Sequence, residues 1–105
     1  MPQRHEIYLV RVPLRASFDY RPCIVLDVSH NTIVVGVMLV SSSSLYRKAY
    51  DFLIPKEHPN FAATGLKKTS FAIGDQIRDV AAADLNQYLG RLEGELAREF
   101  DKWIS

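Results

Sequence analysis

The sequence predicts a mainly β domain: a small, strongly bent antiparallel β-barrel with one helix at its C-terminus. The first observation is that residues 6–80 contain several short runs rich in β-branched residues, separated by prolines and turn residues. The second is an amphipathic stripe near the end of the chain, where apolar residues recur every four positions, at Leu92, Leu96, Phe100 and Ile104. That stripe must be buried, and the most economical partner is one face of the sheet. The chain of 105 residues is expected to form a single domain, residues 1–105.

The strand predictions follow from alternation and from the residues that end each run. "EIYLVRV" alternates two faces and is closed by Pro13. "PCIVLDV" and "TIVVGVMLV" are separated only by "SHN", so we expect an antiparallel hairpin. "AYDFLI" is closed by Pro55, and residues 55–66, with two prolines and a glycine, are expected to form a loop. The predicted strands are therefore residues 6–12, 22–28, 32–40, 49–54 and, as one or two strands, 69–80.

After Val80 the pattern changes from strand to helix. A short helical turn is expected from Ala81 to Leu85, and an amphipathic helix from Leu92 to Ile104 with Trp103 as its anchor. Five or six strands and one helix in a chain of this length suit an SH3-like barrel.

Composition places the protein among soluble globular domains, with 48% hydrophobic and 24% charged residues. The longest apolar run, residues 32–40, is about half the ~20 residues needed to span a bilayer. The N-terminal residues lack a signal-type apolar core, so we expect a cytoplasmic protein without membrane contact. The single Cys23 cannot form an intrachain disulfide and is expected in the core.

Charge is distributed unevenly along the chain. Residues 1–78 hold ten Lys/Arg against six Asp/Glu, or +4, and residues 79–105 hold three against six, or −3. The basic part includes "YRK" at 46–48 and "LKK" at 66–68. Both a phosphate-binding face and a set of merely solubilising lysines fit this pattern.

A carboxylate interrupts the strand pattern of "TSFAIGDQIRDV", residues 69–80. Regular alternation would place Asp75 on the apolar face with Phe71, Ile73 and Ile77, where an unpaired carboxylate costs several kcal/mol. Two explanations stay open: Gly74 marks a bulge that turns the acid away, or the acid faces a special pocket.

Three polar features stand at the ends of apolar runs: "YRP" at 20–22, "SSSS" at 41–44 and "GDQIR" at 74–78. If one mouth of the barrel collects them, the site has a cation, hydroxyls and a carboxylate, which suits cleavage of RNA without a metal ion. The 2′-hydroxyl of RNA is then the nucleophile, with Asp75 as base, Arg21 as phosphate ligand, and Ser41 and Ser42 as hydrogen-bond donors.

Each of these residues also has a purely structural interpretation. Asp75 can hydrogen-bond backbone in a turn, Arg21 can be a solvated residue before proline, and the serine run can be a turn. The three histidines, His5, His30 and His58, lack ligand spacing, so neither a metal nor a cofactor is expected.

At these residues the chain resembles the MazF/PemK (Kid) family of type II toxin–antitoxin systems. "RHEIYLVRV" is similar to that family's "RGEIWLV", "RPCIVLDV" to its "RPAVVLS", "VMLVSSS" to its "VPVTS", and "TGLKKTSFAIGDQIRDV" to its "GLKKPSVVLVDQIRTV". The closing "LGRLEGELAREFDKWI" is similar to its "LGRLSPEELAEVDEAL", so the resemblance runs in order from Arg4 to Ile104.

The resemblance implies an SH3-like barrel of the MazF/PemK/CcdB type, a homodimer with a composite groove for single-stranded RNA, and metal-independent cleavage at short motifs to a 2′,3′-cyclic phosphate. It also implies a cognate antitoxin with a disordered tail that blocks the groove. Carried over to this chain, the catalytic residues are Arg21, Ser41 and Asp75. The residues expected to contact RNA are Ser42, Lys48, Thr69, Gln76 and Arg78.

Two alternatives belong to other functional classes. The C-terminal "FDKWIS" resembles the tryptophan-containing tail of the gyrase-binding CcdB toxins. A catalytically inactive relative that binds only antitoxin or RNA is suggested by Ile73, where some family members have arginine, and by the short, glycine-free "PLRASFDY".

Overall fold

The computed structural model describes residues 2–13, 17–29, 31, 33–43 and 50–105. It contains six strands and one α-helix, with short 3₁₀ turns at Ala62–Thr64 (η1) and Ala82–Asp84 (η2). The strands are β1 (Glu6–Pro13), β2 (Phe18–Val28), β3 (Val34–Ser41), β4 (Phe52–Ile54), β5 (Ser70–Ala81) and β6 (Leu85–Arg91), and the helix is α1 (Gly94–Ile104). All the predicted strands are present, and residues 69–80 form one long strand rather than two.

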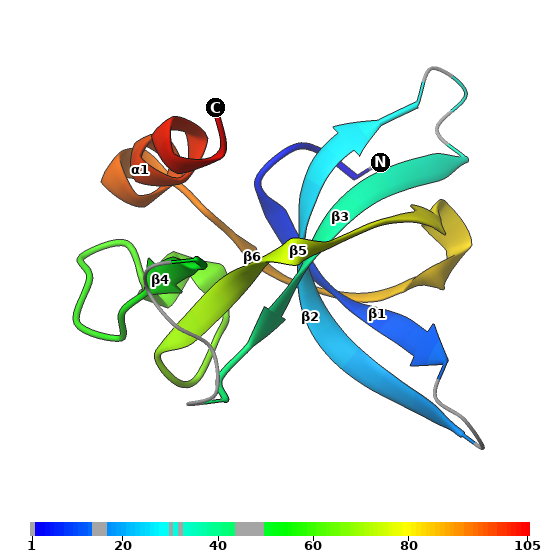
Figure 1. Ribbon diagram of the computed structural model, residues 1–105, viewed down its shortest axis with the longest axis horizontal. Coiled ribbons are helices and arrows are strands. Elements are labelled where there is room, and N and C mark those ends of the chain that lie inside the picture. Colours follow the sequence, from blue (N-terminus) through cyan, green and yellow to red (C-terminus); the bar gives the residue numbers. More distant parts are fainter. Residues whose placement is uncertain (1, 14–16, 30, 32, 44–49) are drawn as a thin grey trace.

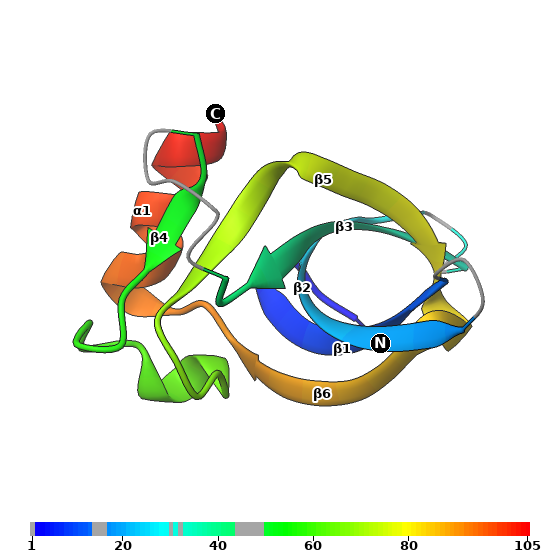
Figure 2. The ribbon, with the colours of Figure 1, turned by 60° about the horizontal axis from the view of Figure 1, so that its bottom comes forward.

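The strands form one antiparallel sheet in the order β4-β5-β3-β2-β1-β6 (Figure 1). The sheet curls strongly, but its edge strands β4 and β6 are not paired with each other, so the barrel is not closed (Figure 2). The mainly β, barrel-like fold with a C-terminal helix is thus confirmed in an open form. The hairpin of β2 and β3 is also present, with Cys23 opposite Leu39.

Strand β6 is the element that sequence reasoning missed. The helical turn before it is present as η2, but residues 85–91 pair with β1, Leu9 lying opposite Gln87 and Ile7 opposite Gly90. Most side chains of β6 are exposed, because it is an edge strand with little apolar alternation. Its pairing partner is 78 positions away (87 − 9), so no local pattern marks it.

Two apolar clusters lie on the two faces of the curled sheet. One is sandwiched between sheet and helix and includes Ile24, Val40, Phe52, Leu96 and Phe100. The other lies inside the curl and is built mainly from valines with the fully buried Cys23, as expected. The helix contributes Leu96 and Phe100, and the Trp103 ring packs 5.7 Å from Phe52 and 5.8 Å from Phe100. Each distance is measured between ring centroids.

Within the described residues, no helix is long and apolar enough to cross a membrane. The only α-helix among them is α1, which is 11 residues long.

Candidate functional site

The carboxylate at Asp75 sits on a bulge in β5. Strand β5 pairs with β3 as Ile77 opposite Met38 and then as Ala72 opposite Val40, so residues 73–76 oppose Leu39 alone. The extra residues break the alternation and turn Asp75 outward, where it is exposed. Of the two explanations open from the sequence, the bulge at Gly74 is confirmed.

Close packing holds this bulge in place. The Gly74 N–H donates a 3.0 Å hydrogen bond to Oδ1 of the buried Asp51. A Cβ atom at Gly74 would lie 2.9 Å from the Tyr50 carbonyl oxygen and 3.4 Å from the Trp103 ring. Glycine is therefore required here by the close approach of backbone and ring, independently of any catalytic role.

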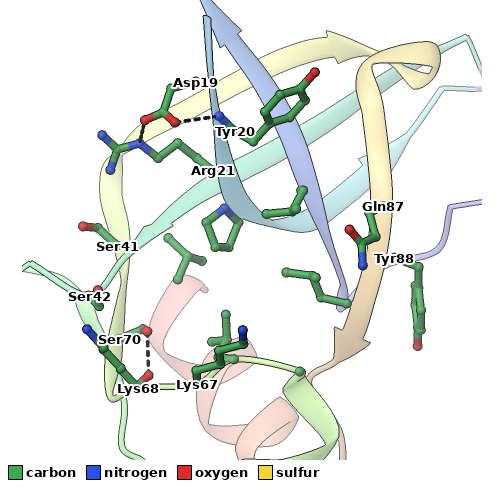
Figure 3. Close-up of a pocket in the computed structure, with 16 residues that line it drawn as sticks. Asp19, Tyr20, Arg21, Ser41, Ser42, Lys67, Lys68, Ser70, Gln87 and Tyr88 are labelled. Atoms are coloured by element: carbon green, nitrogen blue, oxygen red, sulfur yellow. Dashed lines mark hydrogen bonds and ion pairs between the residues drawn. The ribbon is translucent and has the colours of Figure 1, made fainter.

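A large pocket of about 860 Å³ is lined by residues of β1, β2, β3 and β6 and of the segment that leads into β5 (Figure 3). We call it the Arg21 pocket. Its floor is apolar, formed by Leu9, Pro22, Val40, Leu66 and Leu89. Polar side chains stand around it, namely Asp19, Tyr20, Arg21, Ser41, Ser42, Lys67, Lys68, Ser70 and Gln87. An apolar floor with a few convergent polar groups is typical of a ligand site.

Arg21 is held at the pocket by its neighbour on the same face of β2. Its Nε lies 3.0 Å from Oδ2 of Asp19, whose Oδ1 accepts a 2.8 Å hydrogen bond from the Tyr20 N–H. Among the described residues no other ion pair of Arg21 is present, and its terminal nitrogens project beyond Asp19 (Figure 3). This edge of a guanidinium is the one that binds phosphate oxygens in a bidentate manner.

Hydroxyls and two lysines complete the polar rim. Ser41, at the end of β3, is buried, and its Oγ accepts a 3.1 Å hydrogen bond from the Ser43 N–H. The hydroxyl of Ser70 donates a 2.8 Å bond to the Lys68 carbonyl oxygen and so braces the segment that carries both lysines. Together Arg21, Lys67 and Lys68 set three cations against the one carboxylate of Asp19, an excess suited to an anionic ligand.

The three predicted polar features are not all collected by one pocket of a single chain. Arg21, Ser41 and Ser42 line the same pocket, as expected. Asp75 lines a second hollow of about 670 Å³, with Tyr50, Ile77 and Trp103 among its neighbours. The pairing of Asp75 with Arg21 in catalysis therefore stays a prediction.

Three of the other predicted RNA contacts, Thr69, Gln76 and Arg78, lie outside the Arg21 pocket. The Thr69 hydroxyl oxygen accepts a 2.9 Å hydrogen bond from the Lys56 N–H, which ties the start of the loop after β4 to the residue that precedes β5. Farther along β5, Arg78 donates a 3.1 Å hydrogen bond to the Gln76 side-chain oxygen. Lys48 lies outside the described residues.

Four further residues of the pocket, Asp19, Lys67, Lys68 and Gln87, were not predicted as site residues from the sequence. Asp19 stands two positions before Arg21, and strand alternation places both side chains on one face of β2. The sequence could therefore have predicted Asp19 as a neighbour of Arg21. The charge distribution of the sequence includes Lys67 and Lys68, but no motif marks them as residues of this pocket. Gln87 belongs to β6, and without that strand no pattern connects it to Arg21.

The described histidines have structural partners on α1. His5 Nε2 lies 2.7 Å from Oδ1 of Asp101, and His58 Nε2 lies 3.3 Å from Oε1 of Glu99. The hydrogen bond from His5, followed by that from Arg4, holds the pKa of the Asp101 carboxyl below its ordinary value. Within the described part of the chain, no three His, Cys, Asp or Glu side chains gather as a metal site requires.

Comparison with known proteins agrees with the motifs. No curated protein sequence matches the chain significantly. The family described as PemK-like, MazF-like toxin of type II toxin–antitoxin system matches residues 3–105, nearly the whole chain. On this match and the fold described above, the chain belongs to the PemK-like, MazF-like toxins of type II toxin–antitoxin systems.

Proposed function

We propose that this toxin is an endoribonuclease that cleaves single-stranded RNA at short sequence motifs without a metal ion. The observation that carries the proposal is the presence of Arg21 and Ser41 in one pocket with a cationic rim. Both residues stand at the positions where the family's motifs place its catalytic arginine and hydroxyl.

The chemistry needs little from the protein beyond binding and proton transfer. The 2′-hydroxyl oxygen of the substrate attacks the adjacent phosphorus while its proton goes to a base. The bond from phosphorus to the 5′-oxygen breaks as that oxygen takes up a proton from solvent water, which leaves a 2′,3′-cyclic phosphate and a 5′-hydroxyl. Arg21 binds two phosphate oxygens, Ser41 donates a hydrogen bond, and the lysines stabilise the charge that develops in the transition state.

The base is assigned to Asp75 of a second copy of the chain. Asp75 lies in a different hollow from Arg21, so one chain does not present both to one phosphate from the same pocket. A homodimer in which the hollow of one subunit adjoins the pocket of the other completes the site. Asp19 is the competing candidate, because its carboxylate already lines the Arg21 pocket.

A cognate antitoxin is the expected protein partner, and the cytoplasm is the compartment where toxin, antitoxin and mRNA meet. An acidic, extended antitoxin tail would find three cations at the rim of the Arg21 pocket. Such a tail blocks RNA by occupying the same pocket.

The gyrase-binding alternative receives less support from the position of Trp103. Its ring packs against Phe52 and Phe100 rather than standing free in a tail. The tryptophan therefore contributes to the core that holds α1 on the sheet.

The test is digestion of long RNA by purified protein in EDTA, followed by mapping of the fragment ends. The parent is expected to give discrete fragments with cyclic phosphate ends. Arg21→Ala and Ser41→Ala should each lower the rate about 10²- to 10³-fold, the usual cost of losing one transition-state donor. Arg98→Ala, an exposed arginine on α1, is the matched control and should cut like the parent. Absence of cleavage by the parent, or unchanged cleavage by Arg21→Ala, contradicts the proposal.

A further inference from the structure

The Arg21 pocket has two chemically different ends. Cations and hydroxyls line it together with the Tyr20 ring and the Gln87 amide, and Gln87 stands across the pocket from Arg21 (Figure 3). Between them lies the apolar floor, where Leu9 of β1 is opposite Pro22 on one neighbour and Gln87 on the other. An anion gains nothing from such a floor, but a flat, weakly polar ring does.

Gln87 is aimed into the pocket by an irregularity in β6. The register of β1 and β6 passes from Leu9 opposite Gln87 to Val10 opposite Leu85, so Asn86 is an extra residue. Figure 3 shows the Gln87 amide turned toward the middle of the pocket while the Tyr88 ring points away. Bulges of this kind commonly redirect a side chain next to a functional site.

The hydrogen-bonding groups of the Gln87 side-chain amide are also available to a ligand. Among the described residues it has no hydrogen-bond partner, and its side chain is exposed to the pocket. A side-chain amide offers donors and an acceptor side by side, the combination that pairs with the edge of a nucleobase.

We propose that this end of the Arg21 pocket is a nucleobase subsite, in which a base lies on the apolar floor against the Tyr20 ring and the Gln87 amide reads its edge. The inference rests on the proposed function for its substrate class, single-stranded nucleic acid. Contacts to phosphate position a nucleic acid, whereas contacts to base edges specify its sequence. Arg21 and the lysines accordingly set affinity, and Gln87 sets which base is accepted.

The pocket is large enough for both tasks. Its volume of about 860 Å³ lies at the upper end of the range of roughly 300–1,000 Å³ that small-ligand sites occupy. A base at Gln87 therefore leaves room for the adjoining phosphate at Arg21.

The test uses single-stranded DNA with eight random positions between fixed ends, because DNA lacks the 2′-hydroxyl and binding is measured without cleavage. Bound molecules are sequenced for the parent, Gln87→Leu and the matched control Asn86→Leu, which removes a neighbouring amide outside the pocket. The parent and Asn86→Leu are expected to enrich one base at one position about fivefold or more, and Gln87→Leu less than about twofold, since a bidentate base contact accounts for such discrimination. Tyr20→Leu should weaken binding of all sequences about tenfold, as loss of a stacking ring does.

The outcomes separate this inference from the proposed function. A parent that selects no base, or a Gln87→Leu variant that selects the same base as strongly as the parent, overturns the nucleobase subsite. A parent that selects a base through Gln87 but leaves long RNA uncut overturns the nuclease and keeps the subsite. The free energy of unfolding of both leucine variants, measured in urea, confirms that each is folded.

Discussion

Asp19 and Arg21 form an ion pair along one face of β2, with 3.0 Å between Oδ2 of the aspartate and Nε of the arginine. The other oxygen of Asp19 accepts a hydrogen bond from the Tyr20 N–H at 2.8 Å. Because both carboxylate oxygens are used, the carboxylate orients the guanidinium and leaves its terminal nitrogens for a ligand. We therefore expect Asp19 to act as a positioning residue for the proposed phosphate ligand rather than as the base.

Asp19→Asn is expected to lower the rate of RNA cleavage about two- to fivefold, because a half-exposed ion pair contributes about 1 kcal/mol or less. The shape of the pH–rate profile should not change, since a positioning residue transfers no proton. Single-turnover rates across the pH range check both statements. A loss of 10²-fold or more together with loss of the acidic limb would instead identify Asp19 as the base.

Mixed dimers test whether Asp75 acts across a subunit interface. Arg21→Ala and Asp75→Asn proteins are each expected to be inactive, but after joint unfolding and refolding half of the dimers contain one copy of each. Each such dimer holds one intact shared site, so about a quarter of the parental activity should return. If Arg21 and Asp75 of the same chain act together, no activity returns on mixing.

The sequence predicted the parts of the fold that have a local cause. The valine-rich strands β2 and β3, the buried Cys23 and the helical stripe of α1 all follow from burial periodicity. Gly74 before a misplaced acid left two explanations open, and the bulge is the one that the strand register shows. Strand β6 could not be predicted in the same way, because its pairing with β1 is long-range and its residues are mostly exposed. The prediction of the site was incomplete for the same reason. Gln87 is brought to the pocket by β6, and Asp75 lies apart from Arg21 because of the way the whole sheet curls.

Gly74→Ala should destabilise the protein by about 1–3 kcal/mol, the usual cost of forcing a methyl group into a filled space. The added Cβ would lie 2.9 Å from the Tyr50 carbonyl oxygen, which is backbone and yields little. Gly36→Ala is the matched control, because its Cβ would meet no atom closer than 3.6 Å. Urea unfolding measures both. Equal free energies of unfolding for the two variants would show that the bulge is not tightly packed.

Cys23 should resist thiol reagents in the folded protein. Burial raises the pKa of its thiol to about 12, and its side chain is fully buried, so neither thiolate nor access is available near neutral pH. Labelling by a chromogenic disulfide at pH 8 is expected to be slow in buffer and rapid in denaturing urea. Rapid labelling without urea would mean that the sheet opens around β2.

Asp101 should make the stability of the protein depend on acid pH. Its pKa is lowered in the folded state, chiefly by the hydrogen bond from His5 and then by that from Arg4. A carboxyl with a lowered folded pKa contributes stability above its unfolded pKa, ordinarily 3.8, and loses it as the pH falls through the folded value. Asp101→Asn should therefore have a lower free energy of unfolding than the parent at pH 6, and the difference should shrink as the pH falls below about 4.

Glu95→Gln is the control, because its partner Arg98 lies on the fully exposed surface of α1, where solvent screens the pair. Urea unfolding at several pH values measures all three proteins, and a parent–Asp101→Asn difference that stays constant down to pH 2 would contradict this role for Asp101.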